Sequence, residues 1–175
     1  MLDETLLVKR SQQGDMKAFE ALYRNNSGRI FALCYRLCGQ REWAEDFVQE
    51  TFIKAWQNLG GFNGKSKVSS WLHRIASNVV IDKLRQKHRW SEDSLDESNW
   101  EQSQHVFDHH EDMDIEKLLM ALPERSRTVL ILYEYLGYKH QEISKLTGIP
   151  IGTSKSLLNR ARAKLGDNNA GLINE

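Results

Sequence analysis

The chain has 175 residues, of which 40% are hydrophobic and 27% are charged, and its 24 basic side chains balance 24 acidic ones. This length allows one or two small domains and excludes a large catalytic architecture. A mean hydropathy of -0.58 and apolar runs of only a few residues exclude insertion into a membrane as a helix. The first residues include acids and lack an apolar segment with a cleavage site, so we expect no secretion signal and a cytoplasmic location.

The zero net charge conceals an uneven distribution along the chain. Residues 1–90 carry 15 basic and 9 acidic side chains, a net charge of +6, and residues 117–175 carry 9 basic and 5 acidic ones, a net charge of +4. Residues 91–116 between them hold ten acids and neither Lys nor Arg. Two basic regions joined by an acidic segment are typical of two polyanion-binding modules with a self-repelling linker. A solvated acidic loop between ordinary domains is the alternative that composition leaves open.

Helical periodicity dominates the N-terminal half. Apolar residues recur at spacings of three and four, and Gly39 and the pair Gly60-Gly61 are helix stops. Asp15 stands where its side chain would cap the first helix. Four helices are therefore expected, one after Asp15 and three over residues 30–38, 44–56 and 71–89, with a loop over residues 62–70 before the last.

Residues 91–113 consist mainly of Ser, Asp, Glu, Gln, Asn and His, with too few apolar residues to build a core. We interpret this segment as a mobile linker. Helical patterns resume at Ile115, a helix over residues 129–136 is expected to end at a glycine, and no stretch alternates as a strand would. The sequence therefore predicts an all-α protein with two small helical domains, residues 1–90 and 114–175, joined by a flexible acidic linker.

The most specific motif is a pair of short helices, predicted over residues 140–147 and 152–165, around a turn that contains Gly148 and Pro150. This spacing is typical of a helix-turn-helix. Helical projection places one narrow face of the second helix in the core, namely Ser154, Leu158, Ala161 and Leu165. The other side carries the small, polar and basic residues expected to enter a DNA major groove, namely Gly152, Thr153, Lys155, Ser156, Asn159 and Arg160. An ordinary surface face of a helical hairpin is the alternative.

Residues 138–165, YKHQEISKLTGIPIGTSKSLLNRARAKL, resemble the promoter-reading helix-turn-helix of the extracytoplasmic-function (ECF) sigma factors. Residues 44–56, AEDFVQETFIKAW, followed by FNG at 62–64 and WLHRIASNVVIDKLR at 71–85, resemble the other domain of that family. The resemblance implies a bacterial initiation subunit that binds the clamp helices and flap of core RNA polymerase and promoter DNA. It also implies an anti-sigma factor as a partner, and neither a catalytic domain nor a cofactor.

The third predicted helix carries a polar face beside apolar residues, and such a face can dock on a helix pair through a hydrophobic centre and a charged rim. The resemblance implies that the polymerase clamp helices bind here, through Glu45, Asp46, Phe47, Gln49, Glu50 and Lys54. A solvated amphipathic face is the alternative reading.

Strand opening needs a pocket, aromatic contacts and cations that hold an unstacked base and its backbone. Asn78, Asp82, Arg85 and Arg89 recur as one polar stripe on the fourth helix, whereas Trp71 is expected in the core. The resemblance implies that this stripe and the preceding loop face the single strand of the -10 element. The residues assigned to this site are Phe62, Lys65, Lys67, Arg74, Asn78, Asp82 and Arg85.

Three positions depart from the usual family pattern. Ser154 replaces a branched apolar residue, so its hydroxyl faces the core and needs a hydrogen-bond partner such as the carbonyl of the preceding turn. Leu157 replaces an arginine and is expected to meet a thymine methyl group instead. Trp43 replaces a polar residue, and we expect it to be exposed and available to a partner.

Other classes of function remain as alternatives. A helix-turn-helix regulator that binds duplex DNA without polymerase would explain the second domain and leave the first unexplained. A metal-dependent enzyme would have to use His105, His109, His110, Glu111 and Asp112, which lie in the linker without supporting structure. Cys34 and Cys38 would suit metal binding or oxidation sensing, although burial on one helix face fits their spacing better. We expect no enzymatic activity, no metal and no cofactor.

Overall fold

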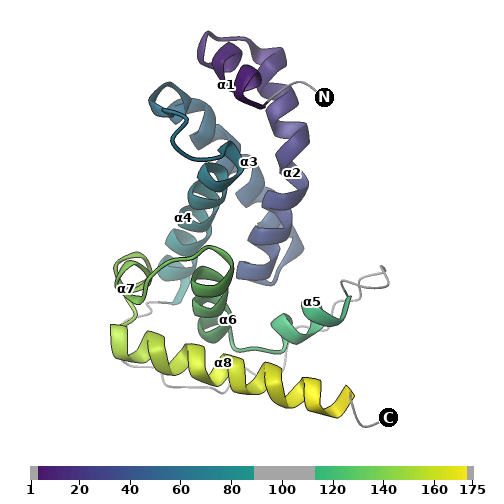
Figure 1. Cartoon of the computed structure of the whole chain (residues 1–175), viewed down its shortest axis with the longest axis vertical. Coiled ribbons are helices and arrows are strands. Elements are labelled where there is room, and N and C mark those ends of the chain that lie inside the picture. The colour runs from purple at the N-terminus through teal and green to yellow at the C-terminus, as the bar shows by residue number, and fades with distance from the viewer. Residues whose placement is uncertain (1–3, 89–112, 173–175) are drawn as a thin grey trace. The chain divides into compact units, whose positions relative to one another are not determined.

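The computed structural model describes residues 4–88 and 113–172, which form helices and loops without a β-strand (Figure 1). The predicted all-α fold class is confirmed. The chain divides into two compact units, Met1–Val80 and Ile81–Glu175. Most of the predicted linker, and Arg89 with it, lies outside the described residues. No helix in the described ranges is long and apolar enough to cross a membrane.

The N-terminal unit begins with α1, Glu4–Gln12, a helix that the periodicity analysis missed. It packs on α2, Met16–Cys38, and buries Leu7, Val8 and Ser11. Asp15 caps α2 as predicted, because its side chain accepts the backbone N–H groups of Lys17 and Ala18. The side chain of Arg10 pairs with the same carboxylate, which ties the end of α1 to the start of α2.

The two apolar stripes predicted after Asp15 belong to one continuous helix rather than to two. Residues 25–28 contain Asn, Ser and Gly but do not interrupt α2. Asn26 is 1% exposed, and its Nδ2 donates to the carbonyl of Leu22 (3.0 Å), so this buried amide is satisfied within the helix. The helix ends where predicted, at Gly39, whose φ of 72° is a left-handed conformation that glycine adopts without strain.

Helix α3, Arg41–Asn58, packs along α2 and continues into a single 3₁₀ turn, η1, Leu59–Gly61. Aromatic rings join the two helices, with Phe19 and Trp56 at 4.9 Å and Tyr23 and Phe52 at 4.7 Å between centroids. Helix α4, Val68–His88, begins three residues before its predicted start. The earlier start follows from burial of Val68, which is 6% exposed.

In the C-terminal unit, α5 spans Met113–Met120 and α6 spans Glu124–Leu130. The regular helix predicted over residues 129–136 instead widens into a π-helix, η2, Ile131–Tyr135. Its widening is visible in the bond from the N–H of Leu136 to the carbonyl of Ile131 (3.1 Å), five residues back. Periodicity could not reveal this change, because both helix types bury Ile131 and Leu132.

Helix α7, His140–Thr147, has the predicted bounds, and α8 spans Ile151–Leu172, beyond its predicted end. The turn between them holds Gly148 at a φ of 79°. Thr147 fixes this turn, because its hydroxyl donates to the carbonyl of Ile143 (2.7 Å) and accepts the N–H of Ile149 (3.1 Å). Helix α8 packs on both α6 and α7 (Figure 1). The predicted helix-turn-helix geometry is therefore present.

Candidate nucleic-acid and polymerase interfaces

The first candidate surface is the outward face of α8. Its inward face is buried as predicted at Ser154, Leu158 and Ala161, which are at most 3% exposed, whereas Leu165 is partly exposed. Of the six predicted DNA-binding residues, Thr153 and Ser156 are partly exposed, and Gly152, Lys155, Asn159 and Arg160 are exposed. The side chains that combine positive charge with hydrogen-bond donors thus lie on the solvent side of a rigidly packed helix.

Ser154 and Leu157, the two residues of α8 that depart from the usual family pattern, are both buried. The hydroxyl of Ser154 lies 2.9 Å from Nδ1 of His140, the first residue of α7, and not against the preceding-turn carbonyl. The His140 ring also stacks on Tyr133, with 4.7 Å between centroids. Leu157 is only 9% exposed, so the prediction that it meets a thymine methyl group is wrong.

Cations surround the His140 ring. Burial lowers its pKa below 6.5, and the positive charges of Lys155 and Arg162 lower this pKa further. Arg162 lies over the Tyr133 ring at 5.7 Å and pairs with Glu134, whose Oε1 is 2.8 Å from Nε. The π-helix, α7 and α8 are therefore joined by one polar and aromatic cluster.

The second candidate surface is formed by the loop after η1 and the exposed side of α4. Lys65, Lys67, Arg74 and Asn78 are exposed, and so are Asp82 and Arg85, which follow at the same helical register. The ring of Phe62 is partly buried and lies 5.0 Å from the ring of Trp71. Trp71 is itself only partly buried, in contrast to the core position expected for it.

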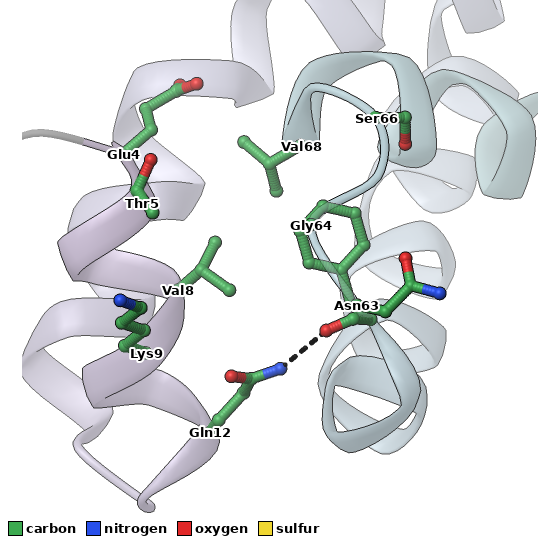
Figure 2. Close-up of a pocket in the computed structure, with 10 residues that line it drawn as sticks. Glu4, Thr5, Val8, Lys9, Gln12, Asn63, Gly64, Ser66 and Val68 are labelled. Carbon is green, nitrogen blue, oxygen red and sulfur yellow. Dashed lines mark hydrogen bonds between the residues drawn. The ribbon is translucent and has the colours of Figure 1, made fainter.

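A cleft of about 240 Å³ separates this loop from α1. Figure 2 shows Val8 and Val68 pointing into it from opposite walls, with Thr5 and Lys9 on the α1 side. Sequence reasoning missed the α1 wall altogether, because residues 4–12 were not recognised as a helix. The complete set of lining residues is Glu4, Thr5, Val8, Lys9, Gln12, Phe62, Asn63, Gly64, Ser66 and Val68.

The third candidate surface is the outward face of α3. Glu45, Asp46 and Gln49 are exposed, and Glu50 and Lys54 are partly exposed and joined by an ion pair (3.0 Å). This surface has an apolar centre, as predicted, but the exposed apolar residue is Ile53 and not Phe47.

Phe47 is only 4% exposed, so its side chain is part of the domain core and is not available on this surface as predicted. Ile53 is 58% exposed instead. The signal for Ile53 was present in the sequence, since it lies three residues after Glu50 and four after Gln49 on one helical face. Trp43, expected to be exposed, is partly buried and packs edge-on against Phe47, with 6.2 Å between ring centroids.

The two cysteines lie inside the N-terminal unit. Cys34 and Cys38 are both thiols rather than halves of a disulfide, and they are 0% and 5% exposed. Burial is the main cause that raises the pKa of the Cys34 thiol to about 12, and the neighbouring Cys38 is the smaller one. Within residues 4–88 and 113–172, no three His, Cys, Asp or Glu side chains form a group that could hold a metal ion. The histidines and acids at positions 105–112 lie outside those ranges.

Comparison with known proteins gives two family matches on this chain. Residues 22–90 match the Sigma-70 region 2 family, and residues 112–165 match the Sigma-70 region 4 family. The first match contains the α3 and α4 surfaces and the loop between them. The second contains the outward face of α8.

The similarity to known proteins extends over nearly the whole chain. The ECF RNA polymerase sigma factor SigW of Bacillus subtilis is 33% identical over 90% of this chain and 92% of its own length. The RNA polymerase sigma-H factor of Pseudomonas aeruginosa is 32% identical over 89% of this chain and 88% of its own length.

Solved structures agree with these relatives. The sigma factor RpoE of Bartonella quintana, solved with the anti-sigma factor NepR, has a TM-score of 0.56 and 26% identity, covering 87% of this chain and 96% of its own. CnrH, solved with the cytosolic domain of CnrY, has a TM-score of 0.52 and 25% identity, covering 95% of this chain and 96% of its own.

Proposed function

The chain belongs to the ECF sigma factors, which direct RNA polymerase to promoters for transcription initiation, and we propose that it divides this task among the three surfaces described above. Residues 1–90 and 114–175 act as separate modules in this proposal. The observation that carries it is the outward face of α8, where a buried inner face orients Lys155, Asn159 and Arg160 toward solvent.

The α8 surface reads the duplex of the -35 element. Arg and Lys donate to guanine and to phosphates, and Asn bonds to adenine in the major groove. Gly152 and Thr153 lie in the first turn of α8, where small side chains let the helix end approach the DNA backbone. Because helices α6 and α7 both pack against α8, the orientation of this face is set before DNA binds.

The loop and the exposed side of α4 hold the opened strand of the -10 element. Lys65 and Lys67 neutralise its phosphates, and Asn78 offers both donors and an acceptor to an unstacked base. The partly buried Phe62 ring forms an apolar wall for such a base. The adjoining cleft is lined by both apolar and polar groups, and it accommodates a base that has flipped out of the stack.

The α3 surface binds the clamp helices of core polymerase, with Ile53 as its apolar centre and Asp46, Gln49, Glu50 and Lys54 around it. The proposal also includes binding of the C-terminal unit to the polymerase flap. It places the protein in the cytoplasm and gives the free protein no catalytic activity. The structurally similar sigma factor RpoE is solved with the anti-sigma factor NepR, and CnrH is solved with the cytosolic domain of CnrY. We therefore extend the proposal to an anti-sigma partner for this chain.

Run-off transcription with core polymerase over a genomic promoter library tests this proposal. The full chain is expected to give promoter-specific transcripts only when core polymerase is present. Footprinting then separates the surfaces, since variants of α8 should lose upstream protection and variants of the loop and α4 should lose permanganate reactivity near position -10. Tight sequence-specific binding to duplex DNA that core polymerase does not change would contradict the proposal and favour a regulator that acts without polymerase.

A further inference from the structure

One side chain of α1 holds the loop that follows η1. The amide nitrogen of Gln12 donates to the carbonyl of Leu59 (2.9 Å) and to the carbonyl of Phe62 (2.9 Å), and Figure 2 shows this side chain reaching across the cleft. A glutamine nitrogen carries two N–H groups, so both of its hydrogens are committed to the loop backbone. Gln12 thus fixes two points, one at each end of the η1 turn, to a different helix.

The remaining contacts of this loop are of a different kind. The side chain of Asn63 accepts the N–H of Lys65 (3.1 Å), and Gly64 takes a φ of 72°. These features shape the tip of the loop but do not attach it to the rest of the unit. Its attachments include the buried side chain of Leu59 at the start of η1, the Phe62 ring on Trp71 from one side and Gln12 from the other.

Helix α1 is a firm support for such an attachment. Leu7 and Val8 are 2% and 6% exposed, and Arg10 pairs with Asp15, the residue that caps α2. That carboxylate accepts the N–H of Ala18 and bonds to Arg10, and both contacts lower the pKa of Asp15. The end of α1, where Gln12 lies, is therefore held within two or three residues of an ion pair and a helix cap.

We propose that Gln12 is a positioning residue for promoter opening, which holds the backbone of residues 59–62 so that Phe62, Lys65 and Lys67 are presented to the opened strand. This inference rests on the proposed function of the loop. It makes α1 part of the -10 module, although α1 lies before residue 22, where the matched region 2 begins. It also assigns the specificity of the loop partly to a side chain that need not touch DNA.

The test uses the full chain with three substitutions. Gln12→Glu keeps the shape of the side chain, removes both donors and sets a carboxylate against two carbonyl oxygens. Gln12→Lys restores donors from a side chain of similar reach. Gln13→Glu is the matched control, because the Gln13 side chain is exposed. The backbone N–H of Gln13 donates to the carbonyl of Arg10 (3.0 Å), and the substitution leaves this bond in place.

Two measurements separate the inference from the function on which it rests. In the free protein, NMR amide exchange at Phe62 and Lys65 is expected to be about five to ten times faster in Gln12→Glu, and unchanged in Gln13→Glu. In the holoenzyme, binding of fluorescent single-stranded -10 oligonucleotides measures the preference for the promoter base over a substituted one. We expect the ratio of the two affinities to fall close to one in Gln12→Glu and to return toward the wild-type ratio in Gln12→Lys.

Each outcome has a defined meaning. General destabilisation of the N-terminal unit would lower the active fraction but leave the ratio between the two oligonucleotides unchanged, so an unchanged ratio overturns the positioning role. Unchanged amide exchange in Gln12→Glu, or equal defects in the Glu and Lys variants, overturns it as well. A wild-type holoenzyme without any base preference overturns the proposed function of the loop, whatever the exchange data show.

Discussion

Nδ1 of His140 lies 2.9 Å from the hydroxyl of Ser154, and this contact joins the first residue of α7 to the buried face of α8. Ser154 is 0% exposed, so its hydroxyl has no access to water and relies on this partner. The His140 ring stacks on Tyr133 of the π-helix, which extends the connection to a third element. The buried hydroxyl thus has the partner that its position requires, and this partner is a side chain that ties the two helices of the motif together.

Ser154→Ala is expected to loosen the contact between α7 and α8. Removing the hydroxyl leaves Nδ1 of His140 without this partner, at a cost of about 1 kcal/mol, because a neutral hydrogen bond contributes that amount. Amide exchange in α7 and α8 should become about fivefold faster. Ser156→Ala is the control, since Ser156 is partly exposed and its hydroxyl donates to the nearby carbonyl of Thr153 in the same helix. Equal exchange in both variants would show that the His140 contact contributes nothing.

The surroundings of His140 also make the C-terminal unit sensitive to acid. Burial first, then Lys155 and Arg162, lowers the pKa of His140 in the folded chain below its ordinary value of 6.5. A depressed pKa means that the fold favours the neutral ring, so this contribution to stability is present above pH 6.5 and is lost as the pH falls through the lower folded value.

We therefore expect α7 and α8 to lose protection against amide exchange, after correction for intrinsic rates, as the pH falls below 6.5 and through the lower folded value. His140→Gln should remove this pH dependence in the C-terminal unit. His73 also has a pKa lowered by burial and by Arg29, but it lies in the N-terminal unit, where its effect is measured separately. An NMR titration that places the folded pKa of His140 above 6.5 would contradict the expected direction.

Helix boundaries were predictable from the sequence where local signals mark both ends. Helix α7 has the expected bounds because Gly148 stops it, and α2 ends at Gly39 for the same reason. Helix α1 was missed, since a nine-residue helix has few apolar positions and owes its stability to packing on α2. The widening at η2 was equally invisible, because hydrogen-bond pattern and burial pattern are separate properties.

The candidate surfaces were predictable in their charged residues and less so in their apolar ones. Lys155, Asn159 and Arg160 are exposed as expected, because charged residues opposite an apolar stripe face water. Phe47 and Leu157 were misplaced, because periodicity alone leaves apolar residues at the edge of a stripe undecided. Gln12 was out of reach of any local pattern, since its partners lie 47 and 50 residues along the chain.

Ile53→Glu is expected to weaken binding to core polymerase by more than tenfold. Ile53 is 58% exposed, so the substitution removes the apolar centre of the α3 surface while the domain core stays intact. Leu6→Glu is a matched control, since Leu6 is 45% exposed on α1. Fluorescence titration of labelled core polymerase provides the measurement. Equal affinities for the two variants would remove Ile53 from the interface.

Cys34 is expected to be inert toward thiol reagents in the folded protein. The thiolate is the reactive form, and burial together with Cys38 raises the pKa of Cys34 to about 12, so almost none is present at neutral pH. Titration with a disulfide reagent should therefore label Cys34 only after unfolding in guanidinium chloride. Rapid labelling of the native chain, identified by mass spectrometry, would instead support the oxidation-sensing alternative.

Lys155→Ala and Arg160→Ala are expected to weaken recognition of the -35 element in ways that distinguish their contacts. A side chain that bonds to a base should cost about 1 to 3 kcal/mol at the matching promoter and relax specificity at one position. A side chain that bonds to a phosphate should weaken all promoters alike and reduce the slope of affinity against salt by about one.

Holoenzyme binding to promoter fragments at several salt concentrations, with each -35 position substituted in turn, separates the two kinds of contact. Lys117→Ala is the control, because Lys117 is an exposed lysine on α5, outside the helix-turn-helix. We expect the longer guanidinium of Arg160 to contact a base, since arginine matches guanine through two parallel bonds, and Lys155 to contact a phosphate as a point charge. Loss of affinity in the Lys117 variant equal to that in both others would mean that general charge, and not the face of α8, accounts for binding.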